Sequence, residues 1–474
     1  MRQTLQRLLP PLHFGRRVGC AHSRRCFSDA TSDPPAPSTP APALPTWDCV
    51  KFEHVVRASQ RIKSGIVRTP ISRSHWLSEE LGCSVFLKHE QQQFTGSFKE
   101  RGARNALLAL SESEARNGVV AASAGNHALA LCWHGKELNI PVTVVMPTVA
   151  PMAKVDKCRA FLRGTGGQIV IHGANIGESK AHAMEVYASS ADRPAGARYI
   201  NGYDDPEIIA GTGTIGMEII EQLPECDVVV VPIGGAGLIA GIALAVKTLN
   251  PSVRVIGVEP KRCESYSAAL EAGHPVAAET LPTLADGLAV PVVGPHAFAV
   301  ASHWVDEVVS VEERDVAISV LRLCEGEKMI VEGGGATGLA AMLPGGPLDR
   351  ADLKGKAVCV PLCGGNIDIT VLGRVIDRGL AADGRLVRCT VAVSDRPGGI
   401  ASLSQTLADL GGSVKDIFHE RAWLHTAIDE VVVKVVLETR GHEHNAEIEA
   451  ALRSLYNDVK ISEAPHPRPC YNDV

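Results

Sequence analysis

Thr95-Gly-Ser-Phe-Lys-Glu-Arg-Gly-Ala103 is the stretch around which the chain is organised. Its lysine follows a glycine-bearing turn and leads into a predicted helix, residues 98–110, after a predicted strand, residues 85–90. The apolar stripe of this helix consists of Ala103, Ala106, Leu107 and Leu110. An amine attacks a carbonyl carbon only when it is neutral, so a partly desolvated Lys99 is a candidate Schiff-base nucleophile. The alternative is a solvated lysine in the first turn of the helix, because most lysines are exposed.

The composition describes a chain long enough for two or three domains with substantial cores. It has 474 residues, of which 45% are hydrophobic, 21% charged and only 4% aromatic, and it contains 45 glycines. This balance suits an α/β enzyme with many tight turns. A formal net charge of -6 argues against an extended nucleic-acid surface. No stretch offers the roughly 20 consecutive apolar residues of a membrane helix, so we expect neither nucleic acid nor membrane as a partner.

The amino terminus has the composition of a targeting segment. Residues 1–27 contain several arginines and no acidic residue, which is typical of a mitochondrial transit peptide, and Arg25-Cys-Phe-Ser28 resembles a cleavage site after Phe27. The alternative is a disordered basic tail. Residues 28–46 are rich in Pro, Ser and Ala and should form an extended linker. The predicted location is the mitochondrial matrix, where cysteines without a zinc-binding spacing would be reduced thiols.

From Val119 onward, short apolar runs alternate with helical patterns. The predicted strands span residues 119–123, 142–146, 168–172, 228–232, 253–259 and 357–361. Continuous Val and Ile runs separated by helices indicate parallel strands that are covered on both faces. The predicted fold class is therefore α/β, built from doubly wound subdomains. In such sheets, ligands bind beyond the carboxyl ends of the strands.

A glycine-rich loop follows the strand at 228–232 and opens a predicted helix that ends at Leu249. Glycines let the backbone turn its N–H groups toward an anion, and the helix N-terminus adds a favourable dipole. The candidate phosphate-binding residues are Gly234, Gly235, Ala236, Gly237 and Leu238. Tight packing and a dinucleotide site are the alternatives, although the spacing is not GxGxxG. The methyl group of Ala236 suits this loop if its φ is negative.

Two further segments follow predicted strands. Ser123-Ala-Gly-Asn-His127 opens a predicted helix, residues 126–138, and backbone amides at such a turn can hold a substrate carboxylate. Its alternative is an ordinary capped helix, with Ser123 and Asn126 as capping candidates. Cys363-Gly-Gly-Asn366 ends the strand at 357–361. Taken alone, Cys363 is a small buried hydrophobe.

As an ordered set over about residues 50–380, these motifs resemble the fold-type II pyridoxal 5'-phosphate (PLP) enzymes, and among them the threonine dehydratases (threonine ammonia-lyases). The resemblance implies that Lys99, next to Phe98, binds PLP and later removes the Cα proton. It implies that Asn126 binds the 3-hydroxyl, that the loop 234–238 holds the phosphate, and that Cys363 faces the ring nitrogen. A neutral thiol leaves that nitrogen unprotonated, which suits elimination. The residues implied to bind the substrate are Ser123, Ala124, Gly125, Asn126 and His127.

The implied reaction converts L-threonine to 2-oxobutanoate and ammonia, and L-serine to pyruvate. Serine racemases share the scaffold, but their loop carries a second acid/base serine where this chain has Ala124. A nicotinamide-dependent oxidoreductase would need a GxGxxG fingerprint followed by a downstream acidic residue, and the sequence has none in register. A non-catalytic amino-acid sensor is a further alternative, although the presence of Lys99 argues against it. Asn201-Gly-Tyr-Asp-Asp-Pro206 departs from the Pro-rich form of the resembled enzymes, which leaves the pocket for the β-substituent open.

Residues 259–265 resemble the cation-binding segment of the serine racemases. The resemblance places Glu259 and the carbonyl group of Cys263 on a cation, but Ser265 stands where an aspartate would complete the site. Divalent cations prefer charged oxygen ligands, so this loss favours a monovalent ion or none. The alternative for these residues is a structural ion pair.

The pattern changes after Gly379. Predicted strands at 386–393, 413–423 and 430–438, helices at 399–410 and 444–456, and a last strand from Lys460 give the ferredoxin-like order βαββαβ. Residues 386–464 resemble an ACT domain, a regulatory module that binds amino acids. The residues implied to bind an effector are Asp395, Arg396, Pro397 and Gly398, with a structural turn as the alternative. The PLP-dependent domain would span residues 47–380, with a small subdomain at about 120–198, in a homodimer or homotetramer.

Overall fold

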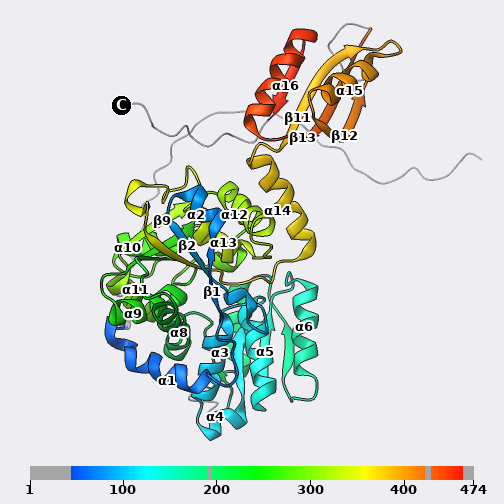
Figure 1. Cartoon of the computed structure of the whole chain (residues 1–474). Helices are drawn as coiled ribbons and strands as arrows, with labels where there is room; N and C mark the ends of the chain where they lie inside the picture. The colour runs from blue at the N-terminus through cyan, green and yellow to red at the C-terminus, as the bar shows by residue number, and fades with distance from the viewer. Residues whose placement is uncertain (1–43, 190–194, 422–428, 463–474) are drawn as a thin grey trace, which may run out of the picture. The chain divides into compact units, whose positions relative to one another are not determined.

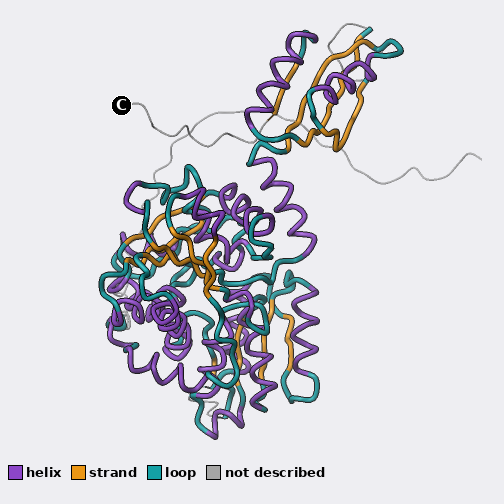
Figure 2. The backbone as a smooth tube through the Cα atoms, in the orientation of Figure 1, coloured by secondary structure: helices purple, strands orange, loops and turns teal. Residues whose placement is uncertain are grey.

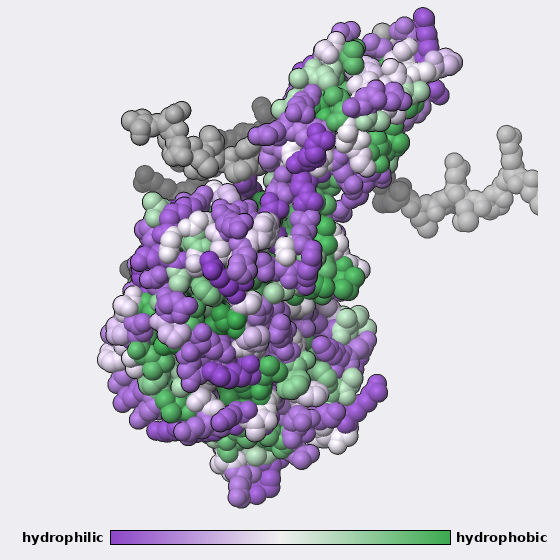
Figure 3. Space-filling view, in the orientation of Figure 1, coloured by the Kyte–Doolittle hydropathy of each residue, from purple (hydrophilic) through white to green (hydrophobic). Residues whose placement is uncertain are grey.

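The computed structural model describes residues 44–189, 195–421 and 429–462 (Figure 1). The predicted transit peptide and most of the linker lie outside these residues. The described strands form three sheets, which Figure 2 shows in orange. No helix in the described part of the chain is long and apolar enough to cross a membrane. The face in Figure 3 carries hydrophilic side chains with smaller apolar patches between them.

The large sheet has six strands, all parallel except β1, which pairs antiparallel with β2 at one edge. In sheet order they are β1 (Ile71–Ser74), β2 (Ser84–Lys88), β10 (Ala357–Pro361), β7 (Val228–Pro232), β8 (Arg254–Pro260) and β9 (Glu307–Val311). Successive strand residues enter different cores, as Val229 and Val230 do. The sheet is therefore covered on both faces.

Helices on the two faces of the large sheet belong to separate hydrophobic clusters. The helices on the Val229 side are α8 (Pro206–Gln222), α9 (Gly237–Leu249) and α11 (Pro295–Trp304). Those on the Val230 side are α2 (His75–Leu81), α12 (Glu313–Glu325) and α13 (Gly333–Ala340). The helix α1 (Phe52–Ile62) packs on α8, and α14 (Ile369–Ala382) packs on α12. This arrangement confirms the predicted doubly wound architecture.

The small sheet is parallel, in the order β5-β4-β3-β6. Its strands are β3 (Val119–Ala122), β4 (Val142–Met146), β5 (Gln168–Ile171) and β6 (Arg198–Tyr199). Its hydrophobic cluster includes residues of α3 (Lys99–Leu108), α5 (Asn126–Leu138) and α6 (Met152–Leu162), and α5 and α6 lie side by side (Figure 1). Nearby short helices are α4 (Glu112–Asn117) and α7 (Ile176–His182). Because β3 leads into α5 and α3 begins at Lys99, two of the predicted motifs meet beside this sheet.

The carboxy-terminal sheet is antiparallel, in the order β12-β13-β11-β14. Its elements are β11 (Leu386–Ser394), α15 (Gly399–Asp409), β12 (Ser413–Glu420), β13 (Glu430–Glu438), α16 (His442–Leu455) and β14 (Val459–Ser462). Leu403 and Leu407 of α15 and Ile448 of α16 join the strand residues in one core. This order of elements and strands is the ferredoxin-like arrangement that the sequence predicts.

Candidate active site

Lys99 is the first residue of α3 and is half-buried. Its Nζ donates a hydrogen bond of 2.6 Å to the carbonyl oxygen of Gly202 and lies 5.0 Å from the ring centroid of Phe98. Burial lowers the pKa of this amine to about 8, although Cys363 and Glu332 act in the opposite direction. The structure thus gives Lys99 the desolvated setting that a nucleophilic amine requires.

The segment after β10 pairs with the turn that carries Lys99. The amide of Phe98 donates to the carbonyl of Cys363 at 3.0 Å, and the amide of Gly365 donates to the carbonyl of Gly96 at 2.9 Å. The Cys363 side chain is buried, and its Sγ donates to the carbonyl of Pro361 at 3.3 Å. Burial raises the pKa of this thiol well above its usual range, so Cys363 stays neutral.

Asn126 begins α5 and joins both segments to α13 through its side-chain amide. Asn366 Nδ2 donates to the carbonyl of Thr95 at 2.6 Å and to Asn126 Oδ1 at 3.0 Å. Asn126 Nδ2 donates to Glu332 Oε1 at 2.6 Å. Three segments that are distant in the sequence therefore converge within hydrogen-bond distance beside Lys99.

Glu332 is a site residue that the sequence does not predict. It immediately precedes α13, is 8% exposed, and its amide donates to the carbonyl of Gly364 at 2.9 Å. Burial raises the pKa of its carboxyl to about 7, Asp286 adds to this, and Lys154, Asn126 and Lys99 oppose it. The sequence signal that could have indicated Glu332 is its place directly before the run Gly333-Gly-Gly335, because a carboxylate is favourable at a helix N-terminus.

The predicted carboxylate loop, Ser123–His127, borders open space. A Cβ on Gly125 would meet no heavy atom within 4 Å, and Ser123 Oγ accepts a hydrogen bond from the Gly125 amide at 3.3 Å. His127 is buried, with its Nε2 3.4 Å from the carbonyl oxygen of Ile200. Burial, together with the charge of Lys99, lowers the pKa of His127 to about 3, so the ring is neutral. A Cβ on Gly202 would lie 2.7 Å from this ring, so His127 packs directly against Gly202. The loop therefore contacts the residue whose carbonyl accepts from the Lys99 amine.

The glycine loop lies between β7 and α9, as predicted, and Tyr203 covers it. A Cβ on Gly235 would lie 2.4 Å from the Tyr203 ring, and one on Gly237 would lie 2.1 Å from the Tyr203 carbonyl oxygen. The condition of a negative φ at Ala236 is not met, because this residue has a φ of 70° and immediately precedes α9. The chain turns into the helix at Ala236 while Tyr203 holds both neighbouring glycines. For a residue with a Cβ, this left-handed backbone costs roughly 1–2 kcal/mol.

The residues of the predicted cation segment contact the protein itself. Glu259 Oε1 accepts from the amide of Tyr266, and Oε2 accepts from the amide and hydroxyl of Ser267, all at the start of α10 (Ser265–Ala272). The alternative of an ion pair is therefore not what the structure shows. The Cys263 thiol contacts the hydroxyl of Thr280 and the carbonyl of Val290. In the described ranges there is no cluster of three His, Cys, Asp or Glu side chains suited to a metal.

Residues 62–364 match the family model described as pyridoxal-phosphate dependent enzyme. The chain belongs to this family of PLP-dependent enzymes. The match covers three of the motifs around Lys99 in full and the first two residues of the fourth, Cys363 and Gly364, and it sets aside the nicotinamide-dependent alternative.

Individual relatives agree with the family match. An L-threonine ammonia-lyase of Thermotoga maritima is 40% identical over 412 residues, which cover 87% of this chain and 99% of the relative. A solved structure, the processed form of threonine deaminase isoform 2 from Solanum lycopersicum, is similar with a TM-score of 0.64 and 34% identity over 69% of this chain and 92% of that one. The structure of maize serine racemase is similar with a TM-score of 0.64 and 32% identity over 70% and 98%.

The residues of this PLP enzyme fit the cofactor of its family. The glycine cradle at the start of the 13-residue helix α9 suits a phosphate group, and the desolvated Lys99 suits an aldehyde. Ser97 Oγ and His127 Nδ1 are buried and have no hydrogen-bond partner among the described residues. Such buried polar atoms are expected where a polar ligand completes a site.

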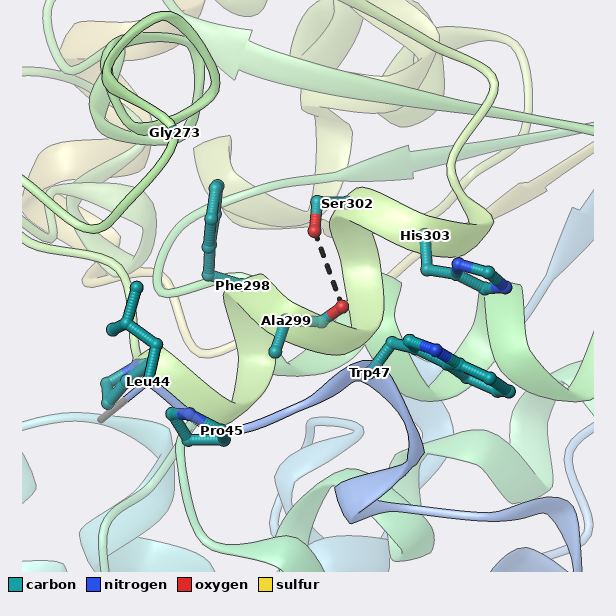
Figure 4. Close-up of a pocket in the computed structure, with 9 residues that line it drawn as sticks. Leu44, Pro45, Trp47, Gly273, Phe298, Ala299, Ser302 and His303 are labelled. Atoms are coloured by element: carbon teal, nitrogen blue, oxygen red, sulfur yellow. Dashed lines mark hydrogen bonds between the residues drawn. The ribbon is translucent and has the colours of Figure 1, made fainter.

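Two surface depressions lie outside this site. One, of about 310 Å³, is lined by Leu44, Pro45, Trp47, Gly273 and residues of α11, and Trp47 stacks on His303 at a ring distance of 4.4 Å (Figure 4). The other, of about 280 Å³, lies in the carboxy-terminal module and is lined by Arg396, Pro397 and Gly398. Asp395, the fourth predicted effector residue, instead pairs with Arg421 at 2.9 Å.

Proposed function

We propose that this PLP enzyme is a threonine ammonia-lyase that converts L-threonine to 2-oxobutanoate and ammonia, and L-serine to pyruvate and ammonia. The observation that carries the proposal is a combination of two features: the Lys99 amine is desolvated, and the side chain at position 124 is the methyl group of an alanine. The names of the relatives from Thermotoga maritima and Solanum lycopersicum support it.

PLP, when bound, supplies an electron sink for the electron pair released at the substrate Cα. Lys99 would hold the cofactor covalently and, once the substrate amine has replaced it there, would accept the Cα proton at Nζ, for which an amine with a pKa near 8 is suited. The Ser123–His127 loop holds the substrate carboxylate, and Asn126 donates to the cofactor 3-oxygen. The neutral Cys363 thiol leaves the ring nitrogen unprotonated. Overall, the Cα proton and the β-hydroxyl leave as one water molecule, and a second water hydrolyses the released enamine acid to a 2-oxo acid and ammonia.

Serine racemase is the second candidate, because the maize enzyme of that name has a similar structure. Racemisation needs an acid/base group on the side of the substrate opposite Lys99. Ala124 carries no such group. The hydroxyl of Ser123, one residue earlier, accepts from the Gly125 amide within its own turn. Elimination needs only the lysine side and a leaving group, so this chain favours the lyase.

The test is a survey of 2-oxo acid formation from individual L-amino acids by the purified PLP-loaded enzyme. We expect 2-oxobutanoate from threonine and pyruvate from serine, with no product from the Lys99→Ala variant, which lacks the covalent link. Turnover of neither amino acid by the wild type, or sustained turnover by Lys99→Ala, would refute the proposal.

For the carboxy-terminal module, residues 386–464, we propose the role of an ACT domain that binds an amino-acid effector. The ferredoxin-like strand order and the depression beside Arg396–Gly398 support this role. The match to the Thermotoga maritima relative is long enough that it must extend into this module. Isoleucine, valine and serine are the effectors to test first.

We also propose that residues 1–27 direct the enzyme to the mitochondrial matrix, on the strength of their arginine-rich, acid-free composition. Residues 1–46 fused to a reporter should enter isolated mitochondria and be cleaved after Phe27, which mass spectrometry of the new amino terminus detects. A homodimer or homotetramer and a monovalent cation near Glu259 remain predictions that light scattering and a salt titration of activity can test.

A further inference from the structure

A chain of hydrogen bonds beside Lys99 has one end fixed by a group that only accepts, a backbone carbonyl. At one end is the backbone carbonyl of Thr95, to which Asn366 donates at 2.6 Å. At the other end is the Glu332 carboxylate, to which Asn126 donates at 2.6 Å. Between them, Asn366 Nδ2 donates to Asn126 Oδ1 at 3.0 Å. A backbone carbonyl only accepts, so Asn366 must turn its NH₂ group toward Thr95. Because this NH₂ group also donates to Asn126 Oδ1, the NH₂ group of Asn126 must face Glu332.

Reversing either amide would break this order. A flipped Asn126 would set its Oδ1 against the Glu332 carboxylate and its NH₂ group against the NH₂ group of Asn366. A flipped Asn366 would set its Oδ1 against the carbonyl of Thr95. Both arrangements leave polar groups without partners in a mostly buried place, which is unfavourable. The structure therefore fixes which face of Asn126 carries donors.

The place of Glu332 is also fixed by the backbone. Its amide donates to the carbonyl of Gly364, and a Cβ on Gly364 would lie 2.3 Å from Glu332 Oε1 and 3.2 Å from Asn126 Nδ2. The carboxylate thus occupies the space that the glycine after Cys363 leaves open. Asn126 Nδ2 donates one N–H to Glu332, and its second N–H can donate to another acceptor.

We propose that Glu332 is a positioning residue, which holds the Asn126 amide so that its second N–H is offered to the PLP 3-oxygen. This inference rests on the role given to Asn126 in the proposed function. Glu332 acts here through Asn126, and its own contact with substrate or cofactor is not required. The orientation of Asn126 requires only an acceptor oxygen at the position of Glu332 Oε1, so a glutamine that presents its Oε1 to Asn126 can replace the carboxylate.

The experiment measures the dissociation constant of PLP from the apoenzyme and the visible absorption band of the bound cofactor. Glu332→Leu, which keeps volume but removes the acceptor, should weaken PLP binding about 10-fold and shift the band, because a hydrogen bond to a charged group is lost. Glu332→Gln should stay within about 3-fold of the wild type. In an Asn126→Ala background, Glu332→Leu should add less than about 2-fold, because the two residues act as one unit.

A matched control breaks the same kind of pair elsewhere. Asn105 Nδ2 donates to Glu207 Oε2 at 2.7 Å, and Arg61 pairs with the same oxygen at 2.9 Å. None of these residues takes part in the hydrogen bonds described around Lys99, so Glu207→Leu should leave the PLP affinity and the absorption band unchanged. If Glu332→Leu does not fold, Asn366→Leu removes the neighbouring link of the chain and carries the same expectation.

Three outcomes would overturn the proposal: unchanged PLP binding and absorption in Glu332→Leu, full additivity with Asn126→Ala, or a loss in Glu332→Gln as large as that in Glu332→Leu. These cofactor readouts do not depend on which amino acid is turned over. An enzyme that forms no 2-oxo acid would refute the proposed function while leaving this test intact.

Discussion

The amine of Lys99 and the carbonyl oxygen of Gly202 lie 2.6 Å apart and share a hydrogen bond. The ring of His127 packs closely against Gly202, where a Cβ would lie 2.7 Å from it. The next residue, Tyr203, covers the glycine loop before α9. The segment around Gly202 therefore touches three of the predicted motifs at once. Through it, the nucleophile, the proposed carboxylate loop and the proposed phosphate loop are set in one geometry.

The depressed pKa of Lys99 predicts how the apoenzyme takes up PLP. Only the neutral amine attacks the aldehyde, so the rate constant should rise about 10-fold per pH unit below pH 8 and level off above it. The ordinary lysine pKa of 10.5 would place this plateau much higher, and the difference comes from burial. Stopped-flow absorbance between pH 6 and 10 measures the profile. If the logarithm of the rate constant continued to rise linearly past pH 9.5, the amine would be solvated and the prediction wrong.

The left-handed backbone at Ala236 predicts a stabilising substitution. Ala236→Gly removes the Cβ from a residue with a φ of 70°, so the free energy of unfolding should increase by about 1 kcal/mol. Urea titration of the apoenzyme measures this change. The control is Gly373→Ala within α14, where the added methyl group meets no heavy atom within 4 Å and should stabilise by up to about 1 kcal/mol because alanine favours helix. A destabilising Ala236→Gly would contradict the strain at this residue.

The raised pKa of Glu332 predicts a pH-dependent stability. Its folded-state pKa of about 7 lies above the ordinary value of 4.5, so the stability it contributes is full below pH 4.5 and is lost as the pH rises to 7. Glu332→Gln does not titrate. Relative to the wild type, the variant should therefore gain about 2 kcal/mol in the free energy of unfolding between pH 5 and pH 8. Urea titrations of both apoenzymes at the two pH values decide this, and parallel curves would count against the buried carboxyl.

The carboxy-terminal module should act as a sensor that the catalytic part does not need for turnover. Deletion of residues 386–474 is expected to leave oxo-acid formation intact and to remove any response to isoleucine, valine or serine, because coupling requires two sites that bias one equilibrium. Activity is measured over an effector titration, with the full-length enzyme in parallel. If the full-length enzyme responds to no amino acid, the module has a structural role instead.

The carboxy-terminal strands, such as Leu386–Ser394, could be predicted from sequence although only alternate residues are buried, and so could the strands of the large sheet that are buried on both faces. Continuous apolar runs such as Val228-Val-Val-Val231 carry that signal. The edge strand β1, Ile71-Ser-Arg-Ser74, carries none, because it is partly exposed and pairs on one side. The two-residue strand β6 is too short for any periodicity.

In the site, Lys99 and Cys363 could be predicted because each sits in a recognisable motif at a strand end or helix start. Glu332 could not, because its role depends on Asn126, which lies 206 residues earlier in the chain. The sign of φ at Ala236 could not be predicted for a similar reason. Contacts of the flanking glycines with Tyr203 fix that turn, and no local pattern records them.

The central claim, elimination with Lys99 as the base and no second acid/base at Ala124, is tested most directly by chiral analysis of L-serine turnover. The PLP-loaded enzyme should form pyruvate with D-serine near zero, and Ala124→Ser should raise the D-serine output by supplying a hydroxyl on the opposite side of the substrate. Formation of D-serine by the wild type at a rate comparable with that of pyruvate would contradict the account.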